Sequence, residues 1–266
     1  MVILWKWMKH SQKRLGMKNN KKSFSNILKA VAEGKIDPVS ALHELGALQN
    51  PETLDFVKID HTRKNRCGFP EFIYGEGKTP GQIIKIICEI SRKKHACLVT
   101  RLTEDSAEII LKEFPKAFYD KNAKVLSIFS GPRKKSKGKI LIVTAGTVDI
   151  PVALEAKYTA EACGCNAEIV TDVGVAGLHR LLSRLKILHG AKVIIVVAGM
   201  EGALPSVIGG LVSCPVIAVP TSAGYGTSLN GLTAMFAMLN SCANGILVTN
   251  INNGFGAGCA AARILK

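Results

Sequence analysis

The sequence lacks any apolar run approaching the roughly 20 residues that a helix needs to cross a bilayer. Aromatic residues are also scarce, at 6%, although hydrophobic residues make up 47% of the 266. This balance argues against a membrane protein, a disordered chain and an aromatic-rich β protein. It favours one or two domains with an aliphatic α/β core.

Paired cysteine motifs are missing as well. The eight cysteines form no CxxC pair and no zinc-type spacing, and several lie within apolar segments. The apolar stretch at the N-terminus is too short for a secretory signal, and no small-residue cleavage site follows it. Reduced thiols and the missing signal together favour a cytoplasmic protein.

Acidic residues are too few to balance the chain, whose net charge is +15. The imbalance is local, because residues 140–266 hold seven Lys or Arg and six Asp or Glu. The excess positive charge lies before them, above all in 6–22 and 133–139, and Trp7 is the one aromatic residue within these two stretches. A flexible extension over 1–22 and a basic linker over 131–139 therefore explain it better than a nucleic-acid surface.

The region 23–130 is expected to form a smaller α+β unit. Ser23 and Asp37-Pro38 have the residue types that begin helices. Further helices are expected over 80–90 and 103–113, strands over 54–60 and 96–100, a strand or connector over 120–130, and a polar loop over 61–79.

After residue 139 the pattern changes to apolar, β-branched runs that alternate with helical segments. The runs are 140–144, 167–171, 193–198, 215–219 and 246–250, and the helical segments are 149–163, 176–189, 203–212, 229–242 and 255–265. Continuous apolar runs of this kind are typical of a parallel sheet buried on both faces. The region 140–266 is therefore expected to be a catalytic α/β domain, a three-layer, doubly wound parallel sheet of the flavodoxin-like kind.

Loops rich in Gly, Ser, Thr and Asn follow the expected strands. In a sheet of this type ligands bind beyond the carboxyl ends of the strands, where such loops can surround phosphates. Glycines can also serve only to make turns, but five loops on one face favour a nucleotide, although none is a P-loop or a GxGxxG motif. The residues expected to bind it are Thr144, Gly146, Thr147, Asp149, Asp172, Gly174, Arg180, Gly199, Ser222, Gly224, Tyr225, Asn250, Asn252, Asn253 and Gly254.

Three charged residues near these loops are candidates for chemistry. Arg180 can pair with a phosphate or carboxylate in forked geometry. Glu201 lies in the apolar segment AGMEGALP, so it is a candidate base or Mg²⁺ ligand, or a charge at a helix N-terminus. His179 is as well suited to a structural as to a catalytic role.

These segments resemble the LarB family, carboxylase/hydrolases of nickel-pincer nucleotide synthesis. The resemblance covers about residues 23–266 and rests on DHTRKNRCGFPE, YGEGKTP, TAGTVDIPVA, TDVGVAGLHR, VAGMEGALPSVIGGL, PVIAVPTSAGYG and NSCANGILVTNINNGFGAG. TAGTVD, GLHR and AGMEGALP are also similar to loops of PurE, the aminoimidazole ribonucleotide carboxylase, but the first and third depart from it. The resemblance implies a PurE-like domain that converts nicotinic acid adenine dinucleotide and CO₂ or bicarbonate into pyridinium-3,5-biscarboxylic acid mononucleotide and AMP. Cleavage of the phosphoanhydride makes Mg²⁺ an expected cofactor, since it would offset the charge of the diphosphate, and no tightly bound organic cofactor is expected.

The resemblance further places a thiol nucleophile at Cys242, in NSCANG. A thiolate that adds to the electron-poor pyridinium ring makes C5 nucleophilic toward CO₂. Without the resemblance, Cys242 is better explained as an inert cysteine that ends a helix. Because Cys242 precedes the fifth strand while the loops follow strands, we expect a neighbouring subunit to complete each site. The family implies a homo-oligomer, an octamer.

Two alternatives differ from this prediction in substrate or in class. A PurE-type carboxylase would act on aminoimidazole ribonucleotide, which His179 supports and the altered loops oppose. A scaffold protein would bind a dinucleotide without turnover and would not depend on Cys242. The sequence leaves open the acceptor of the C5 proton, the choice between CO₂ and bicarbonate, and the contribution of the N-terminal region.

Overall fold

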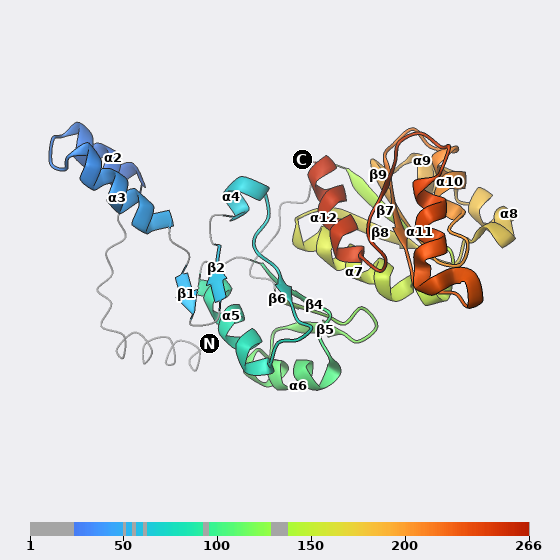
Figure 1. Cartoon of the computed structure of the whole chain (residues 1–266), viewed down its shortest axis with the longest axis horizontal. Helices are drawn as coiled ribbons and strands as arrows, with labels where there is room; N and C mark the ends of the chain where they lie inside the picture. The colour runs from blue at the N-terminus through green and yellow to red at the C-terminus, as the bar shows by residue number, and fades with distance from the viewer. Residues whose placement is uncertain are drawn as a thin grey trace. The chain divides into compact units, whose positions relative to one another are not determined.

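The computed structural model describes residues 24–49, 52–54, 57–60, 63–92, 96–128 and 138–265. The chain divides into two compact units, Met1–Pro51 and Glu52–Lys266 (Figure 1). The predicted extension lies outside the described residues, as does nearly all of the predicted basic linker. The domain boundaries drawn from the sequence thus remain predictions.

Among its described residues, 24–49, the first unit forms helices α2 (Phe24–Ala32) and α3 (Pro38–Gln49), as the sequence predicts. Ile27 of α2 and Ala41 of α3 are buried. The Asp37 carboxylate accepts hydrogen bonds from the main-chain N–H groups of Val39 and Ser40, both at 3.0 Å. Asp37 therefore caps the start of α3. The other predicted cap, Ser23, lies outside the described residues.

The second unit is built around the predicted parallel sheet. Its strands are β7 (Lys139–Thr144), β8 (Asn166–Val170), β9 (Val193–Ala198), β10 (Val216–Pro220) and β11 (Ile246–Val248). They pair in parallel in the order β11-β10-β9-β7-β8. This order reverses direction after β8, as in doubly wound folds, and it confirms the predicted fold class.

Helices cover both faces of this sheet (Figure 1). On one face α7 (Ile150–Ala162) and α12 (Gly254–Ile264) pack against alternate residues of the central strands, among them Ile195 and Val197. On the other face the intervening residues, including Ile194 and Val196, meet the remaining helices of the domain. These helices are α8 (Leu178–Leu182), α9 (Leu185–His189), α10 (Leu204–Gly209) and α11 (Leu232–Leu239). Burial of both faces explains why β9 is apolar at every position.

Small residues bring α7 and α12 close together. A Cβ atom added to Gly254 would lie only 2.2 Å from the main-chain oxygen of Val152, so no larger residue fits there without moving a helix. Ala153, Ala156 and Ala261 are fully buried at the same contact. The close packing fixes where the N-terminus of α12 meets the sheet.

Three predicted helices are shorter than the sequence indicates, and one of them, 203–212, is reduced to α10. The segment 176–189 is divided into η2 (Val175–Gly177), α8 and α9, and the Ser183 hydroxyl at the break donates to the Arg180 carbonyl at 2.7 Å. Such a side-chain bond competes with the helical one. The segment 229–242 forms the turn η3 (Gly226–Gly231) and then α11, which ends at Leu239. Cys242 therefore follows the helix and does not end it.

A second, mixed sheet precedes the parallel one. Its order is β3-β4-β6-β5, formed by β3 (Ile73–Tyr74), β4 (Cys97–Thr100), β6 (Val125–Ile128) and β5 (Phe118–Asp120). The predicted helices α5 (Pro80–Arg92) and α6 (Glu104–Glu113) pack on it. The predicted strand 54–60 is wrong in detail, because β1 (Glu52–Leu54) pairs with β2 (Val57–Ile59), and α4 (Arg63–Cys67) lies in the predicted loop.

Helix α7 also contacts the mixed sheet. Leu98 and Val125 of that sheet form a buried cluster with Ala162 and Tyr158 of α7. The Tyr158 hydroxyl donates a hydrogen bond of 2.7 Å to the Asp120 carboxylate. One helix thus belongs to the packing of both sheets. Within the described ranges, no helix is long and apolar enough to cross a membrane.

Candidate functional site

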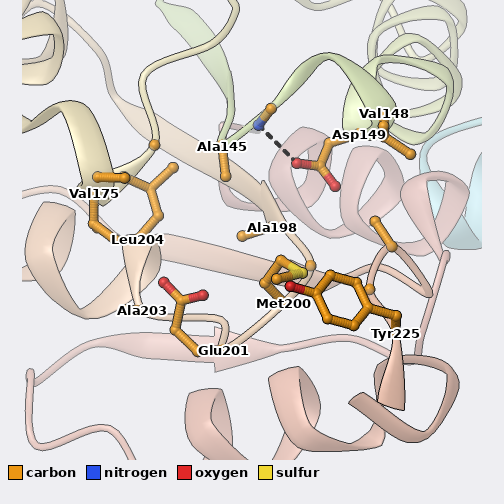
Figure 2. A pocket seen from close by; sticks show the side chains of 16 residues that line it. Ala145, Val148, Asp149, Val175, Ala198, Met200, Glu201, Ala203, Leu204 and Tyr225 are labelled. Carbon is orange, nitrogen blue, oxygen red and sulfur yellow. Dashed lines mark hydrogen bonds between the residues drawn. The ribbon is translucent and has the colours of Figure 1, made fainter. Parts of the chain in front are cut away.

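A pocket of about 370 Å³ opens at the carboxyl ends of the parallel strands (Figure 2). It lies between the loops that follow β7, β8, β9 and β10, which is where the fold class predicts a ligand. Predicted residues that line it are Gly146, Asp149, Gly174, Gly199, Glu201, Gly224 and Tyr225.

The loops after β9 and β10 touch each other at Gly199. A Cβ atom there would lie 2.4 Å from the main-chain oxygen of Ala223 and 2.7 Å from the Thr221 hydroxyl. The main-chain N–H of Met200 donates to the same Ala223 oxygen at 2.8 Å. Gly199 is thus required by a backbone contact, which holds two walls of the pocket together.

Asp149 joins the loop after β7 to the loop after β10. Its carboxylate accepts hydrogen bonds from the Thr221 hydroxyl at 2.7 Å and from the main-chain N–H of Gly146 at 2.9 Å. Burial raises the pKa of Asp149, and these two hydrogen bonds oppose the rise. Asp149 lines the pocket, but both of its carboxylate oxygens are engaged in holding the loops.

Thr144 and the predicted Asp172–Arg180 pair lie on the β8 side of the pocket. Thr144 is buried, and its hydroxyl accepts a hydrogen bond from the main-chain N–H of Asp172 at 3.2 Å. Asp172 has a left-handed backbone, with φ of 56°, and its carboxylate forms an ion pair with Arg180. In this structure Arg180 therefore pairs with the Asp172 carboxylate of its own chain, and neither residue lines the pocket, although the nearby Gly174 does.

Glu201 is the predicted acid whose side chain enters the pocket. It is exposed, and Figure 2 shows its carboxylate pointing into the open space. Among the described residues no three acids, histidines or cysteines gather as a metal site. Because Asp149 and Asp172 are engaged elsewhere, the chain offers one carboxylate here. A Mg²⁺ ion would have to be held mainly by substrate phosphates.

The predicted asparagines after β11 organise loops and do not line the pocket. The Asn252 side chain accepts from the main-chain N–H of Ser222 at 3.0 Å and donates to the Ser222 hydroxyl at 2.9 Å. Asn253 accepts from the N–H of Gly256 at 2.8 Å and so caps α12. The Asn250 side chain accepts from the next main-chain N–H, and Gly254 serves the helix contact described above.

Two residues that the sequence did not single out, Glu155 and Arg101, contact the loop after β11 and the start of α12. Glu155 of α7 is buried and accepts a hydrogen bond of 3.0 Å from the main-chain N–H of Phe255. Arg101, which follows β4 in the mixed sheet, lies 3.5 Å from the Glu155 carboxylate. Burial raises the pKa of Glu155, and Arg101 opposes the rise. Only the tertiary structure brings these residues together, so no sequence signal points to them.

Cys242 lies away from the pocket of its own chain. It is exposed, follows α11 and precedes β11, so it lies at the amino edge of the sheet. All cysteines fall in the described part of the chain, and among them Cys242 alone is exposed. His179 and Thr147 are exposed as well and do not line the pocket.

An exposed apolar surface runs from the pocket to Cys242. Tyr225, at the pocket, is 81% exposed, and Leu229, Leu232, Phe236 and Leu239 continue the surface along η3 and α11 at 37–61% exposure. Cys242 follows three positions later. We call this set of five residues the α11 surface.

The pocket itself is more apolar than the sequence predicts. Val148, Val175, Met200 and Leu204 line it beside the glycines. These residues flank the predicted glycines in the sequence, which is the signal that could have identified them. Apolar walls suit the flat ring of a base or pyridinium better than an extended polar chain.

Comparisons with known proteins divide the chain in the same way as the two sheets. A family model described as LarB/PurE-like N-terminal domain matches residues 51–130, and one described as AIR carboxylase matches 139–266. An uncharacterized protein of Methanocaldococcus jannaschii is 42% identical over 254 residues, which cover 92% of this chain and 98% of the relative. The two matched domains support a carboxylase-related function.

Proposed function

Because the chain belongs to the LarB family, we propose that it carboxylates nicotinic acid adenine dinucleotide at C5 of the pyridinium ring and releases AMP. The other product is pyridinium-3,5-biscarboxylic acid mononucleotide. The observation that carries the proposal is the pocket, which combines apolar walls, glycine-rich loops and one carboxylate at the carboxyl edge of the sheet.

The pocket suits the two chemical parts of such a substrate. Val175, Met200 and Tyr225 offer apolar contact for a flat ring. Glycine-rich loops at Gly146 and Gly224 let a phosphate approach main-chain N–H groups without side chains between them.

The proposed carboxylation uses the Cys242 thiolate as a nucleophile that is regenerated at the end of the reaction. The thiolate adds to the ring, and the electron pair of the broken π bond passes to the ring nitrogen, which makes C5 enamine-like. C5 then forms a bond to the carbon of CO₂. A base removes the C5 proton, and expulsion of the thiolate restores the aromatic ring.

Hydrolysis of the phosphoanhydride completes the proposed reaction. If water attacks the phosphorus of the pyridinium nucleotide, AMP leaves with the bridging oxygen; if it attacks the adenylate phosphorus, AMP keeps the water oxygen and the pyridinium mononucleotide leaves with the bridging oxygen. We assign Glu201, whose carboxylate points into the pocket, to water or to a Mg²⁺ ion, whereas His179, outside the pocket of its own chain, is left without a role. When bound, Mg²⁺ would offset the charge of the diphosphate.

We further propose that a neighbouring subunit supplies Cys242. Helix α11 has eight residues and spans about 12 Å, leading from the pocket edge of the sheet to the edge that carries Cys242. If two copies pack their α11 surfaces in antiparallel fashion, each Cys242 approaches the Tyr225 end of the other copy. The exposed apolar residues of this surface favour such a contact.

Product analysis tests the proposed function. The protein is mixed with nicotinic acid adenine dinucleotide, bicarbonate and Mg²⁺, and the products are identified by mass spectrometry. We expect AMP and a doubly carboxylated pyridinium mononucleotide from the wild type and from Cys214→Ala, a half-buried cysteine that lies outside the pocket. Cys242→Ala should form no carboxylated product. Turnover of aminoimidazole ribonucleotide with none of the dinucleotide would instead support a PurE-type carboxylase.

A further inference from the structure

Arg101 connects the mixed sheet to the loops of the parallel sheet. It follows β4, and its guanidinium Nη2 donates a hydrogen bond of 2.6 Å to the main-chain oxygen of Asn252. Its Nε lies 3.5 Å from the Glu155 carboxylate. One arginine therefore contacts both the loop after β11 and the acid that holds the start of α12.

The backbone on both sides of this contact is held in an uncommon conformation. Arg101 has φ of 54° and Asn252 has φ of 55°. A residue other than glycine adopts the left-handed region at a cost, and it does so where surrounding contacts over-determine it. The two residues are 151 positions apart in the sequence, so the fold itself maintains their contact.

Hydrogen bonds lead from Asn252 to the pocket wall. The Asn252 side chain makes two hydrogen bonds with Ser222, at 3.0 and 2.9 Å. The next residue, Ala223, accepts the Met200 N–H at 2.8 Å, and both Ala223 and Met200 line the pocket. The hydrogen bonds in this path are 2.6–3.0 Å long, and Arg101, which follows β4, connects it to the mixed sheet.

Glu155 extends the effect of Arg101 to helix α12. Its side chain is 7% exposed, and one of its oxygens accepts the Phe255 N–H at 3.0 Å. A buried carboxylate is costly without a nearby positive charge, and the Arg101 side chain, 39% exposed, supplies one. Loss of Arg101 would therefore loosen the start of α12 as well as the loop that contains Asn252.

We propose that Arg101 is a positioning residue through which the N-terminal domain, the mixed-sheet region that the LarB/PurE-like N-terminal model matches over 51–130, sets the geometry of the substrate pocket. It acts by way of Asn252 and Glu155 and does not touch the substrate. This inference gives the N-terminal domain a function in the reaction. The expected change in KM rests on the proposed function, whereas the expected change in hydrogen exchange of the loops does not.

Hydrogen exchange measured by mass spectrometry tests the network without any substrate. In full-length Arg101→Gln, we expect the Ser222 and Phe255 amides to exchange at least about tenfold faster than in the wild type. The control is Lys121→Gln, which breaks an exposed ion pair of 2.7 Å with Glu104 in the same domain. Unchanged exchange at both amides in folded Arg101→Gln would overturn the proposal, whatever the substrate proves to be.

Steady-state kinetics test the consequence for the pocket. Arg101→Gln should lower kcat/KM for the dinucleotide by roughly tenfold or more, mainly through KM, because the loops bind the substrate less well. Arg101→Lys keeps the positive charge beside Glu155 and should recover part of the loss, and Lys121→Gln should match the wild type. Wild-type KM in Arg101→Gln would contradict the inference, whereas absence of turnover in the wild type would contradict only the proposed function.

A double-mutant comparison tests the route. In an Asn252→Ala background, which has already lost the contact with Ser222, Arg101→Gln should accelerate exchange of the Ser222 amide much less than in the wild type. An equal acceleration in both backgrounds would show that Arg101 does not act on Ser222 through Asn252.

Discussion

Most of the polar side chains that were predicted to bind substrate hold the loops around the pocket through hydrogen bonds to other residues. Asp149 was predicted to bind substrate, yet its carboxylate is engaged by Thr221 and Gly146. Residue type and loop position predicted where these residues gather. They could not predict the partners, because Thr221 meets Asp149 across 72 positions of sequence.

Thr221→Val tests this role of Asp149. The variant removes one hydrogen bond from a buried carboxylate, and the free energy of unfolding should fall by about 1–3 kcal/mol at neutral pH. Because the hydrogen bond opposes a pKa already raised by burial, its loss raises the pKa of Asp149 further.

The pH dependence of this effect has a definite sign. A folded-state pKa above the unfolded value means that ionisation opposes folding. The stability lost through Thr221→Val should therefore grow as the pH rises through the folded-state pKa values of Asp149 in the two proteins, both of which lie above the ordinary 3.8. Urea denaturation of both proteins at pH 4 and pH 7 measures it. A loss of stability that is equal at both pH values would contradict the role of Thr221 as a hydrogen-bond donor to the ionised Asp149.

Among helices and strands, those with long apolar patterns were the most predictable. The run 193–198 forms β9 with the predicted bounds, because a central strand is apolar at every position. Short elements such as β3 and α4 were missed, since they depend on contacts made by the folded chain more than on a local pattern. The sequence pattern likewise did not predict that α11 ends at Leu239, before Cys242.

Contact between the loops after β9 and β10 should be necessary for substrate binding. In Gly199→Ala the new Cβ would meet the Ala223 oxygen at 2.4 Å, so the two loops must separate. We expect at least a tenfold loss of dinucleotide affinity by titration calorimetry, a magnitude typical for displaced binding groups.

A matched glycine in the mixed-sheet region serves as the control. A Cβ atom added at Gly81, in α5, would meet nothing within 4 Å. Gly81→Ala should therefore bind as the wild type does and unfold at an equal or slightly higher temperature. Wild-type affinity in Gly199→Ala would show that the loops tolerate separation and that their contact is not needed.

For the molecule as a whole, the feature behind the proposed partner subunit is that Cys242 does not line the pocket of its own chain. Sequence order predicted this separation, because Cys242 precedes a strand and the loops follow strands. The structure adds the α11 surface, since the sequence predicted a helix over 229–242 but not which of its apolar residues are exposed.

Subunit mixing tests the shared site. Cys242→Ala and Glu201→Gln should each be inactive alone, because each lacks one of the proposed groups. Random pairing of the two variants gives some sites in which both groups are intact, so mixed oligomers should recover roughly a quarter of wild-type activity. No recovery after verified subunit exchange would place both groups in the same chain.

The most direct test of the proposed reaction uses ¹³C-labelled bicarbonate with nicotinic acid adenine dinucleotide and observes the product by NMR. We predict a new labelled carboxyl carbon coupled to the pyridinium ring at C5, with AMP formed alongside it, and no label in the product of Cys242→Ala. AMP release with no labelled carbon on the ring, or equal labelling by Cys242→Ala, would contradict the account.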